Sequence, residues 1–309
     1  MSRPSAIRRR ASAFLESVRG AYAAQTLRSY REMLEMLARE VESMGLDPDL
    51  RRWREPEILR MREAYLKRYA PKTTAKKFVV LNNLLIFCGN SIIPSMRLRR
   101  KLRLPPPERG RVSWQTPGER DLLLETSAGT CRMVLMLGYG LGLRRSEMAQ
   151  LKISDIMGGT VSVLGKGSRT RSLPLEGLLA DEIRKYVNGK RKDLVNAVRM
   201  KHPSVVEPET LLLHGRGSRL SSYAPTSLRD MMHRHGERHN IRLTTHDMRR
   251  TFGRSLHQRG IPTRVIMQLL GHKDEATTIL YLGLDLDDMR SALREMYADI
   301  CTLDTMASQ

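Results

Sequence analysis

Cysteine is scarce in this sequence, with three in 309 residues: Cys88, Cys131 and Cys301. They lie far apart in the chain and form no CxxC pair, so the sequence offers neither a disulfide framework nor a cysteine zinc site. This usage is typical of the reducing cytosol, and we therefore expect a cytoplasmic protein.

Long apolar runs are also missing. The longest, MVLMLGYGLGL at 133–143, is glycine-rich and falls short of the roughly 20 residues that a membrane-spanning helix needs. The basic start, MSRPSAIRRRASAF, is followed by no secretory apolar region, and amphipathic helical pattern begins at Phe14 and Leu15. These absences count against a membrane or secreted protein.

Acidic residues are in deficit, because 54 Lys plus Arg face 33 Asp plus Glu and give a net charge of +21. Residues 1–110 carry +13 of this charge and the remaining 199 residues carry +8. Arginine, which binds phosphate through two parallel hydrogen bonds, outnumbers lysine. The balance predicts a nucleic-acid partner, and we expect the basic start of the chain to be an arm that contacts DNA phosphates.

Helical periodicity runs through the first ninety residues. Four amphipathic segments predict a small bundle with a basic outer face: AFLESV, TLRSYREMLEMLAREVESMG, EPEILRMREAYLKRYA and TTAKKFVVLNNLLIFCGN. Three consecutive prolines in RLRRKLRLPPPERGR then stop the pattern. We therefore predict a helical domain at 1–104, a basic linker at 105–111 and a second domain at 112–309.

The second domain opens with a capping box, in which Thr116 precedes Pro117 and is followed by Glu119. One helix is predicted across CRMVLMLGYGLGLRRSEMAQL. The clear β pattern is TVSVLGKGSRTRSLPL, in which two alternating strands flank the turn GKGS, and the remainder has mainly helical pattern. The expected fold class is mainly α with a small β-sheet (α+β).

Arg144 and Glu147 lie three residues apart, which on a helix usually makes a solvated surface ion pair. Here the glycines of the preceding GYGLGL could let a large ligand approach, and Glu147 could fix the guanidinium of Arg144 from behind. Arg145, which points about 100° away on a helix, is the competing candidate.

Lys166 lies in the predicted hairpin turn GKGSRTR. Thr160 stands where a P-loop needs its first glycine, so this is no nucleotide-binding loop. A solvated hairpin tip is the simpler interpretation. A lysine on a tip with two glycines could also enter a DNA groove.

His246 and Arg249 lie three residues apart in THDMRRTF, on a helix that Thr245 could cap. A neutral imidazole can accept a proton while a guanidinium binds the oxygens of a phosphate, so H-x-x-R suits phosphoryl transfer. Chance occurrence of this pattern is common in a basic protein.

A rival histidine pair occurs in HRHGERHN, where His235 and His239 have the spacing of a zinc site. The pattern lacks the glutamate of H-E-x-x-H, because Glu237 faces elsewhere on a helix. A solvated basic helix is the favoured interpretation.

His272 and Tyr281 lie nine residues apart in LLGHKDEATTILYLG, on opposite faces of any single straight helix. Gly271 ends the preceding apolar pattern and Asp274 could cap a new short helix that ends at Gly283. Two separate elements could therefore bring the side chains together, with a hinge at the break.

In order along the chain, these boxes resemble those of the tyrosine recombinases, the phage-integrase family. LGLRRSE resembles the first arginine box, GKGSRTRSLPL the lysine hairpin, and THDMRRTF with LLGHKDEATTILYL the H-x-x-R, G-H and tyrosine boxes. The departures are Arg250, where a histidine is common, and a glycine-rich GYGLGLRR. The resemblance covers essentially the whole chain and implies a helical core-binding domain and a catalytic domain that form a C-shaped clamp on DNA.

The resemblance also implies the site residues and their roles. Tyr281 would attack a phosphodiester to give a 3′-phosphotyrosine, without ATP, cofactor or metal. The remaining roles would be these: Arg144 and Arg249 as phosphate clamp, His246 as general base, Lys166 as general acid, and His272 as hydrogen-bond donor to the phosphate. Glu147 would orient Arg144 or His246.

Double-stranded DNA and further copies of the chain are the implied partners, since the family acts as a tetramer on two duplexes. A tail helix at about 284–301 carries one apolar stripe: Leu286, Met289, Leu293, Met296 and Ile300. That stripe could pack on its own subunit or be exchanged with a neighbour. Accessory or directionality proteins are possible further partners, and the sequence leaves their presence open.

The core-binding pattern begins near residue 12, which favours a simple recombinase for dimer resolution or for a mobile element. A type IB topoisomerase is the alternative enzyme, although the H-x-x-R and G-H boxes count against it. An architectural DNA-binding protein without activity is the alternative of another class.

Overall fold

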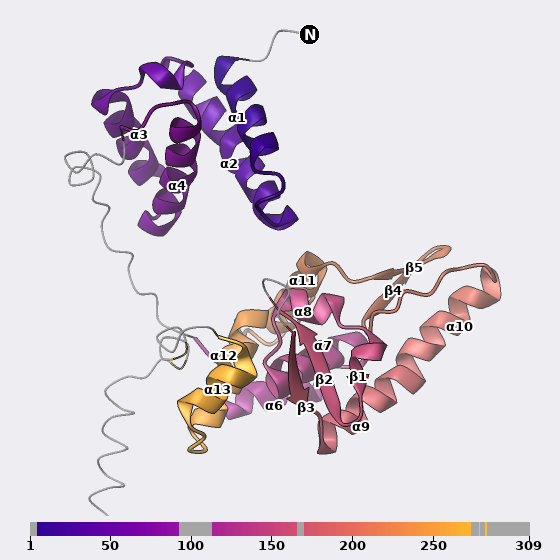
Figure 1. The fold of residues 1–309 in the computed structure, drawn as a ribbon. Helices are drawn as coiled ribbons and strands as arrows, with labels where there is room; N and C mark the ends of the chain where they lie inside the picture. Colours follow the sequence, from indigo (N-terminus) through magenta and orange to yellow (C-terminus); the bar gives the residue numbers. More distant parts are fainter. Residues whose placement is uncertain (1–4, 93–112, 166–169, 273–277, 279–281, 283–309) are drawn as a thin grey trace, which may run out of the picture. The chain divides into compact units, whose positions relative to one another are not determined.

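The computed structural model describes residues 5–92, 113–165, 170–272, 278 and 282 (Figure 1). Contacts within the chain divide it into two compact units, 1–110 and 111–309, and each has its own apolar core. The predicted linker at 105–111 lies outside the described residues. Over the ranges that are described, every helix is too short or too polar to cross a membrane.

The first unit is a bundle of helices around a buried tryptophan. Its helices are α1 Ala6–Ser17, α2 Ala24–Ser43, α3 Glu55–Arg68 and α4 Pro71–Phe87, with a 3-10 turn at Leu50–Arg52. Trp53 and Leu81 are fully buried in the core, and the indole N–H of Trp53 donates to the carbonyl of Asp47 at 2.8 Å. The four predicted helical segments are confirmed.

The start of the chain differs from the predicted arm. Helix α1 begins at Ala6, and Ile7 and Ala11 are buried in the core of the first unit. Arg8 lies 2.5 Å from Glu35 and 3.0 Å from Glu42 of α2, so its charge is paired within the unit. The described part of this segment is therefore the first helix of the bundle, because amphipathic helix begins before Phe14. Contact of the segment with DNA phosphates stays a prediction.

The second unit is mainly helical with two small sheets, which confirms the expected α+β class (Figure 1). Its helices are α6 Pro117–Glu125, α7 Gly129–Leu141, α8 Arg145–Gln150, α9 Gly177–Tyr186, α10 Lys192–Lys201, α11 Pro225–Glu237, α12 Thr245–His257 and α13 Thr263–Leu270. Its strands are β1 Ile156–Met157, β2 Thr160–Leu164, β3 Thr170–Pro174, β4 Leu213–Arg216 and β5 Arg219–Ser222.

The predicted hairpin is present, since β2 and β3 pair antiparallel with Val161 opposite Leu173 and Val163 opposite Arg171. Strand β1 extends this sheet at its other edge. A second hairpin, β4–β5, was not predicted. Its sequence signal is the turn RGSR between short stretches of alternating polarity, which is weak because each strand has only four residues.

Helix α6 begins as predicted, and its capping box is confirmed. The hydroxyl of Thr116 accepts from the backbone N–H of Glu119, whose carboxylate accepts in return from the backbone N–H of Thr116 at 2.8 Å. The single helix predicted across residues 131–151 is wrong. It breaks at Gly142, which is left-handed with φ 59°, so α7 and α8 are separate helices.

The glycines before this break do not open space for a ligand. Each one lies against a side chain from another helix: Gly138 against Met248, Gly140 against Leu179 and Gly142 against Phe252. A Cβ at Gly142 would lie 2.5 Å from Cδ1 of Phe252. The glycines therefore allow α9 and α12 to pack closely on α7. Arg249 of α12 donates to the carbonyl of Gly142, two residues before Arg144.

Candidate active site

The first predicted arginine lies at the start of α8. Arg144 is the N-cap of this helix, and the carboxylate of Glu147 accepts from its backbone N–H at 2.7 Å. The same carboxylate accepts from Nη1 of the Arg144 side chain at 2.8 Å. The break at Gly142 thus turns the expected pair on one helix face into a helix cap, which holds Arg144 at the end of the helix.

Glu147 is buried and accepts hydrogen bonds from a second arginine. Arg171 on β3 donates from Nη1 to Oε1 and from Nη2 to Oε2, each at 2.9 Å. Burial alone would raise the pKa of Glu147, but the bonds from Arg171 and Arg144 outweigh it and lower the pKa to about 2. The carboxylate is therefore ionised throughout the physiological pH range.

Arg171 was not among the predicted site residues. The sequence signal for Arg171 is the alternation of inward and outward side chains along β3. Leu173, two residues further on, is buried, and Arg171 pairs with the buried Val163. Alternation therefore places a charged side chain on the inward face of β3. Such a position calls for a buried partner, which in this chain is Glu147.

Helix α12 carries the H-x-x-R pair. Its N-cap is Thr244, whose hydroxyl accepts from the backbone N–H of Asp247 at 3.1 Å, so the predicted cap at Thr245 is displaced by one residue. Arg249 is 1% exposed, donates to the carbonyl of Gly142 at 2.6 Å, and lies 3.9 Å from Glu147. This arginine therefore joins the cluster from the buried side.

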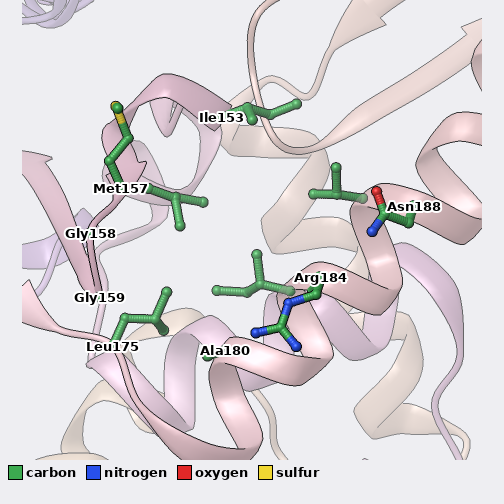
Figure 2. A pocket seen from close by; sticks show the side chains of 11 residues that line it. Ile153, Met157, Gly158, Gly159, Leu175, Ala180, Arg184 and Asn188 are labelled. Carbon is green, nitrogen blue, oxygen red and sulfur yellow. The ribbon is translucent and has the colours of Figure 1, made fainter.

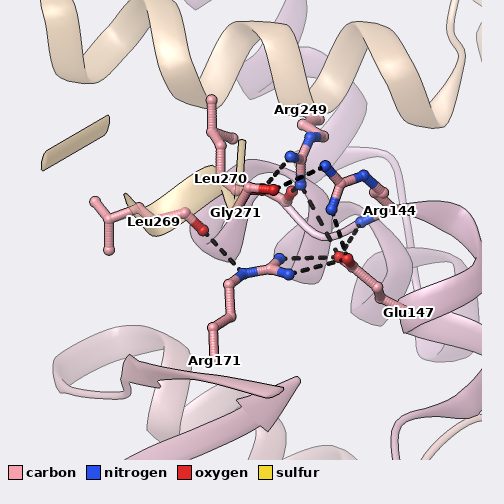
Figure 3. A network of polar contacts seen from close by, with 8 residues as sticks. Arg144, Glu147, Arg171, Arg249, Leu269, Leu270 and Gly271 are labelled. Carbon is pink, nitrogen blue, oxygen red and sulfur yellow. Dashed lines mark hydrogen bonds and ion pairs between the residues drawn. The ribbon is translucent and has the colours of Figure 1, made fainter. Parts of the chain in front are cut away.

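The C-terminal end of α13 receives three arginines. Gly271 is left-handed, and the backbone N–H groups of Gly271 and His272 bond to the carbonyls of Gln268 and Met267. The three carbonyls that follow have different partners: Leu269 accepts from Arg171, Leu270 from Arg249 and Gly271 from Arg144 (Figure 3). The negative end of the helix therefore gathers the guanidinium groups at one point.

His272 follows this turn directly, so it lies beside the cluster. Its Nδ1 is 2.9 Å from the hydroxyl of Thr278, which is fully buried. Burial of the ring and the charges of Arg249, Arg144 and Arg171 lower the pKa of His272 to about 4. The imidazole is therefore neutral at pH 7 and can hydrogen-bond to a bound anion without carrying charge.

His246 lies one turn before Arg249 on α12 and is exposed to solvent. Packing around the ring, followed by the charges of Arg250 and Arg249, lowers its pKa below the ordinary value. A neutral, accessible imidazole is the state in which histidine can accept a proton.

The guanidinium groups of this cluster outnumber its carboxylates among the described residues. Within the part of the chain that the structure describes, Glu147 is the carboxylate that contacts Arg144, Arg171 and Arg249. Three guanidinium groups around one carboxylate leave an excess of positive charge, and backbone carbonyls supply the other acceptors shown in Figure 3. An anion is the ligand that such a site favours.

Lys166, Tyr281, Asp274 and the tail stripe at 284–301 lie outside the described residues. The structure brings together Arg144, Glu147, Arg249 and His272, with His246 one turn from Arg249. Arg145 has no contact with Glu147 among the hydrogen bonds of the site.

The rival histidine pair has structural contacts. Nε2 of His235 lies 2.9 Å from the carbonyl of Leu123, and Nε2 of His239 lies 2.9 Å from the hydroxyl of Thr126. Where the chain is described, no group of three or more His, Cys, Asp or Glu residues is arranged to hold a metal ion.

A groove of 370 Å³ lies elsewhere in the second unit, between the β1–β2 turn and α9 (Figure 2). Met157, Leu175 and Ala180 contribute apolar lining, and Arg184 is the charged residue in it. None of the predicted site residues that the structure describes lines this groove. Its chemistry therefore does not contribute to the arginine cluster.

Comparison with known proteins identifies relatives of this chain. The model of the phage integrase family matches residues 118–286, more than half of the chain. Tyrosine recombinase XerA of Thermococcus kodakarensis is 32% identical over 164 residues, which cover 52% of this chain and 53% of that protein. Tyrosine recombinase XerC of Roseiflexus sp. is 27% identical over 281 residues, which cover 85% and 84%.

Among solved structures, the fold is similar to that of the XerH site-specific recombinase bound to its palindromic difH substrate in a post-cleavage complex. The TM-score is 0.65 with 16% identity, over 90% of this chain and 82% of that one. At this identity the likeness concerns the fold. The chain spans about half the length of several relatives that it matches, including the XerA protein.

Proposed function

Because the chain belongs to the phage integrase family, we propose that it is a site-specific DNA recombinase that breaks and rejoins strands between two duplexes. The observation that carries this proposal is the cluster of three arginines around Glu147, with a neutral His272 beside it. Such a site is suited to a phosphodiester, whose two non-bridging oxygens share one negative charge.

In the proposed cleavage step, the hydroxyl oxygen of Tyr281 forms a bond to phosphorus while the bond from phosphorus to the 5′ oxygen breaks. His246 takes the proton of the tyrosine and Lys166 gives a proton to the leaving 5′ oxygen. The products are a 3′-phosphotyrosine and a free 5′-hydroxyl. The 5′-hydroxyl of the other duplex reverses the step, so no ATP is consumed.

Arg144 and Arg249 would stabilise the charge that develops on the non-bridging oxygens in this step, where other phosphoryl-transfer sites use a metal ion. Their attachment to Glu147 and to the α13 carbonyls supports this role, because pre-positioned donors need little rearrangement when the transition state forms. His272 would donate a hydrogen bond to the same phosphate.

Several copies must act together in the proposed reaction, because exchange between two duplexes needs four cuts. A tetramer on DNA, with the tail stripe at 284–301 packed on a neighbouring copy, is the arrangement we propose. XerH, whose fold is similar, is bound to its palindromic difH substrate in the solved structure, and the net charge of +21 suits DNA as the partner of this chain.

Covalent capture tests the proposal. A library of nicked duplexes with randomised cores is incubated with the protein, and adducts that survive denaturation are isolated and sequenced. We expect an adduct with the wild type and none with Tyr281→Phe. Absence of any adduct with the wild type would leave an architectural DNA-binding role instead.

Strand exchange separates the recombinase from a topoisomerase. Two duplexes that carry a captured sequence are mixed, one of them labelled, and recombinant strands are resolved on a gel. We expect labelled recombinants. Relaxation of supercoiled plasmid without recombinants would contradict the proposal.

A further inference from the structure

One arginine of the cluster is not needed for the proposed phosphate clamp. Arg171 donates to both oxygens of Glu147 and, through Nε, to the carbonyl of Leu269 at 3.1 Å. Its side chain is 14% exposed, whereas that of Arg144 is 31% exposed. Three of its five N–H donors are thus committed to protein acceptors, and it lies deeper than Arg144.

We propose that Arg171 is a positioning residue, whose guanidinium ties β3 to Glu147 and to the end of α13 and so fixes how Arg144 and His272 face the phosphate. This assignment rests on the proposed function, because it concerns the same site. It adds a residue that would act through others without touching DNA.

The geometry gives Arg171 this role through Glu147. Oε1 of Glu147 accepts from both Arg171 and Arg144, and Oε2 accepts from Arg171 and from the Arg144 backbone. A planar guanidinium that holds both oxygens fixes the plane of the carboxylate. The direction of Arg144 is then set, because its Nη1 bonds to one of those oxygens.

The same guanidinium reaches the segment that carries His272. Its Nε bond to Leu269 lies one residue before Leu270 and two before Gly271, which accept from Arg249 and Arg144. A Cβ at Gly271 would lie 3.1 Å from both Cδ and Nη1 of Arg171. Glycine at this position therefore serves the left-handed turn and also admits the arginine.

A lysine cannot replace these contacts. Its three N–H donors lie on one nitrogen at the end of a flexible chain, so they cannot reproduce the planar fork that bonds to both carboxylate oxygens while Nε bonds to a carbonyl. Arg171→Lys would therefore keep the charge and lose the geometry. Arg171→Met would lose both and keep an unbranched side chain in place of the aliphatic part of the arginine.

Arg191 provides a matched control in the same unit. It is 5% exposed, donates to Glu207 at 2.5 Å and to the carbonyl of Pro208 at 2.9 Å, and takes no part in the cluster. Arg191→Met therefore removes a buried arginine with a carboxylate and carbonyl partner, at a place where cleavage should not depend on it.

The experiment measures single-turnover cleavage and equilibrium binding on a nicked duplex that the wild type captures. We expect Arg171→Met and Arg171→Lys to cleave about 10–100-fold more slowly, with the dissociation constant changed less than about threefold. Arg191→Met should lose about as much thermal stability as Arg171→Met and should cleave at the wild-type rate. Wild-type cleavage by Arg171→Lys, or an equal loss in Arg191→Met, would overturn the assignment.

A second readout needs no DNA. In histidine ring NMR spectra of the full chain, Arg171→Met should move the His272 signal and raise its titration midpoint, because Arg171 contributes to its low pKa. Arg191→Met should leave both unchanged. If the wild type forms no adduct while this shift occurs, the proposed function fails and the positioning survives; an unchanged His272 signal in Arg171→Met contradicts the positioning itself.

Discussion

The two units bury cations in different ways. In the first unit Lys77 is 6% exposed, with Nζ 3.7 Å from Glu40 and 4.3 Å and 4.9 Å from the ring centres of Tyr69 and Tyr65. Here one cation meets one carboxylate and two aromatic faces. In the second unit three guanidinium groups meet Glu147 and a row of helix carbonyls.

The difference separates a structural ion pair from a site that favours a ligand. Lys77 and Glu40 carry opposite charges of equal size, and burial lowers the pKa of the lysine despite the opposing effect of Glu40. Among the described residues around Glu147 the positive charge exceeds the negative charge, and the carboxylate stays ionised. The second arrangement attracts an anion, whereas the first has nothing to gain from one.

Loss of Glu147 is expected to have the largest effect on stability. Glu147→Gln leaves buried guanidinium groups without their carboxylate, so the free energy of unfolding should fall by about 3–5 kcal/mol. Urea denaturation measures this. Glu40→Gln in the first unit should cost less, because Lys77 can release its proton, and equal losses would contradict the comparison.

Glycine substitutions compare the same backbone conformation in the two units. Gly142 has φ 59° and Gly45 has φ 61°, but a Cβ meets Phe252 at the first and nothing within 4 Å at the second. Gly142→Ala should lose about 2–4 kcal/mol, from strain together with overpacking, and Gly45→Ala about 1–2 kcal/mol from strain. Thermal unfolding of both variants measures this, and similar losses would show that the contact with Phe252 relaxes freely.

Acid should weaken the second unit through His272. Its pKa is about 4 in the folded chain against an ordinary 6.5, so between these values the unfolded chain binds the proton first. Protonation of His272 therefore leaves the free energy of unfolding unchanged above pH 6.5 and lowers it as the pH falls towards 4. His272→Asn should therefore show a shallower loss of stability over this window in urea titrations. An identical slope, or a ring that titrates near 6.5 by NMR, would contradict the burial of His272 beside the arginines.

The smallest effect is expected when both charges of the first unit are removed. Lys77→Met with Glu40→Gln replaces a buried ion pair by groups that need no counter-charge, and the stability should change by less than about 1 kcal/mol. Urea denaturation of the double variant checks this. A loss as large as that of Glu147→Gln would mean that the Lys77 pair is as integral to its unit as the arginine cluster.

Local signals predicted most of the fold. Capping at Thr116, the helical bundle and the β2–β3 hairpin follow from patterns a few residues long, and α13 ends before Gly271, where the apolar pattern was expected to end. The break at Gly142 was missed, because glycines within an apolar helix are compatible with close packing inside one helix. The residues that pack against it, Arg249 and Phe252, lie on α12, about a hundred residues further along the chain.

The motif positions predicted part of the site. Arg144, Arg249 and His272 converge as their boxes suggested, although Arg144 caps a helix instead of lying on its face. Arg171 was missed because its role depends on Glu147, which the strand faces only in the folded chain. Every residue has a backbone carbonyl, so the sequence does not indicate that the carbonyls of residues 269–271 accept hydrogen bonds from the three arginines.

Arg144→Ala tests the central claim most directly, with Arg132→Ala as its control. Arg132 has similar exposure, 34% against 31%, and also bonds to one carboxylate and one carbonyl. On a captured nicked duplex, we predict that Arg144→Ala binds DNA within about threefold of the wild type, because many basic contacts remain, and loses cleavage about 10²–10³-fold. Arg132→Ala should retain both. Loss of binding in proportion to cleavage, or an equal loss in Arg132→Ala, would contradict the assignment of the cluster as a phosphodiester site.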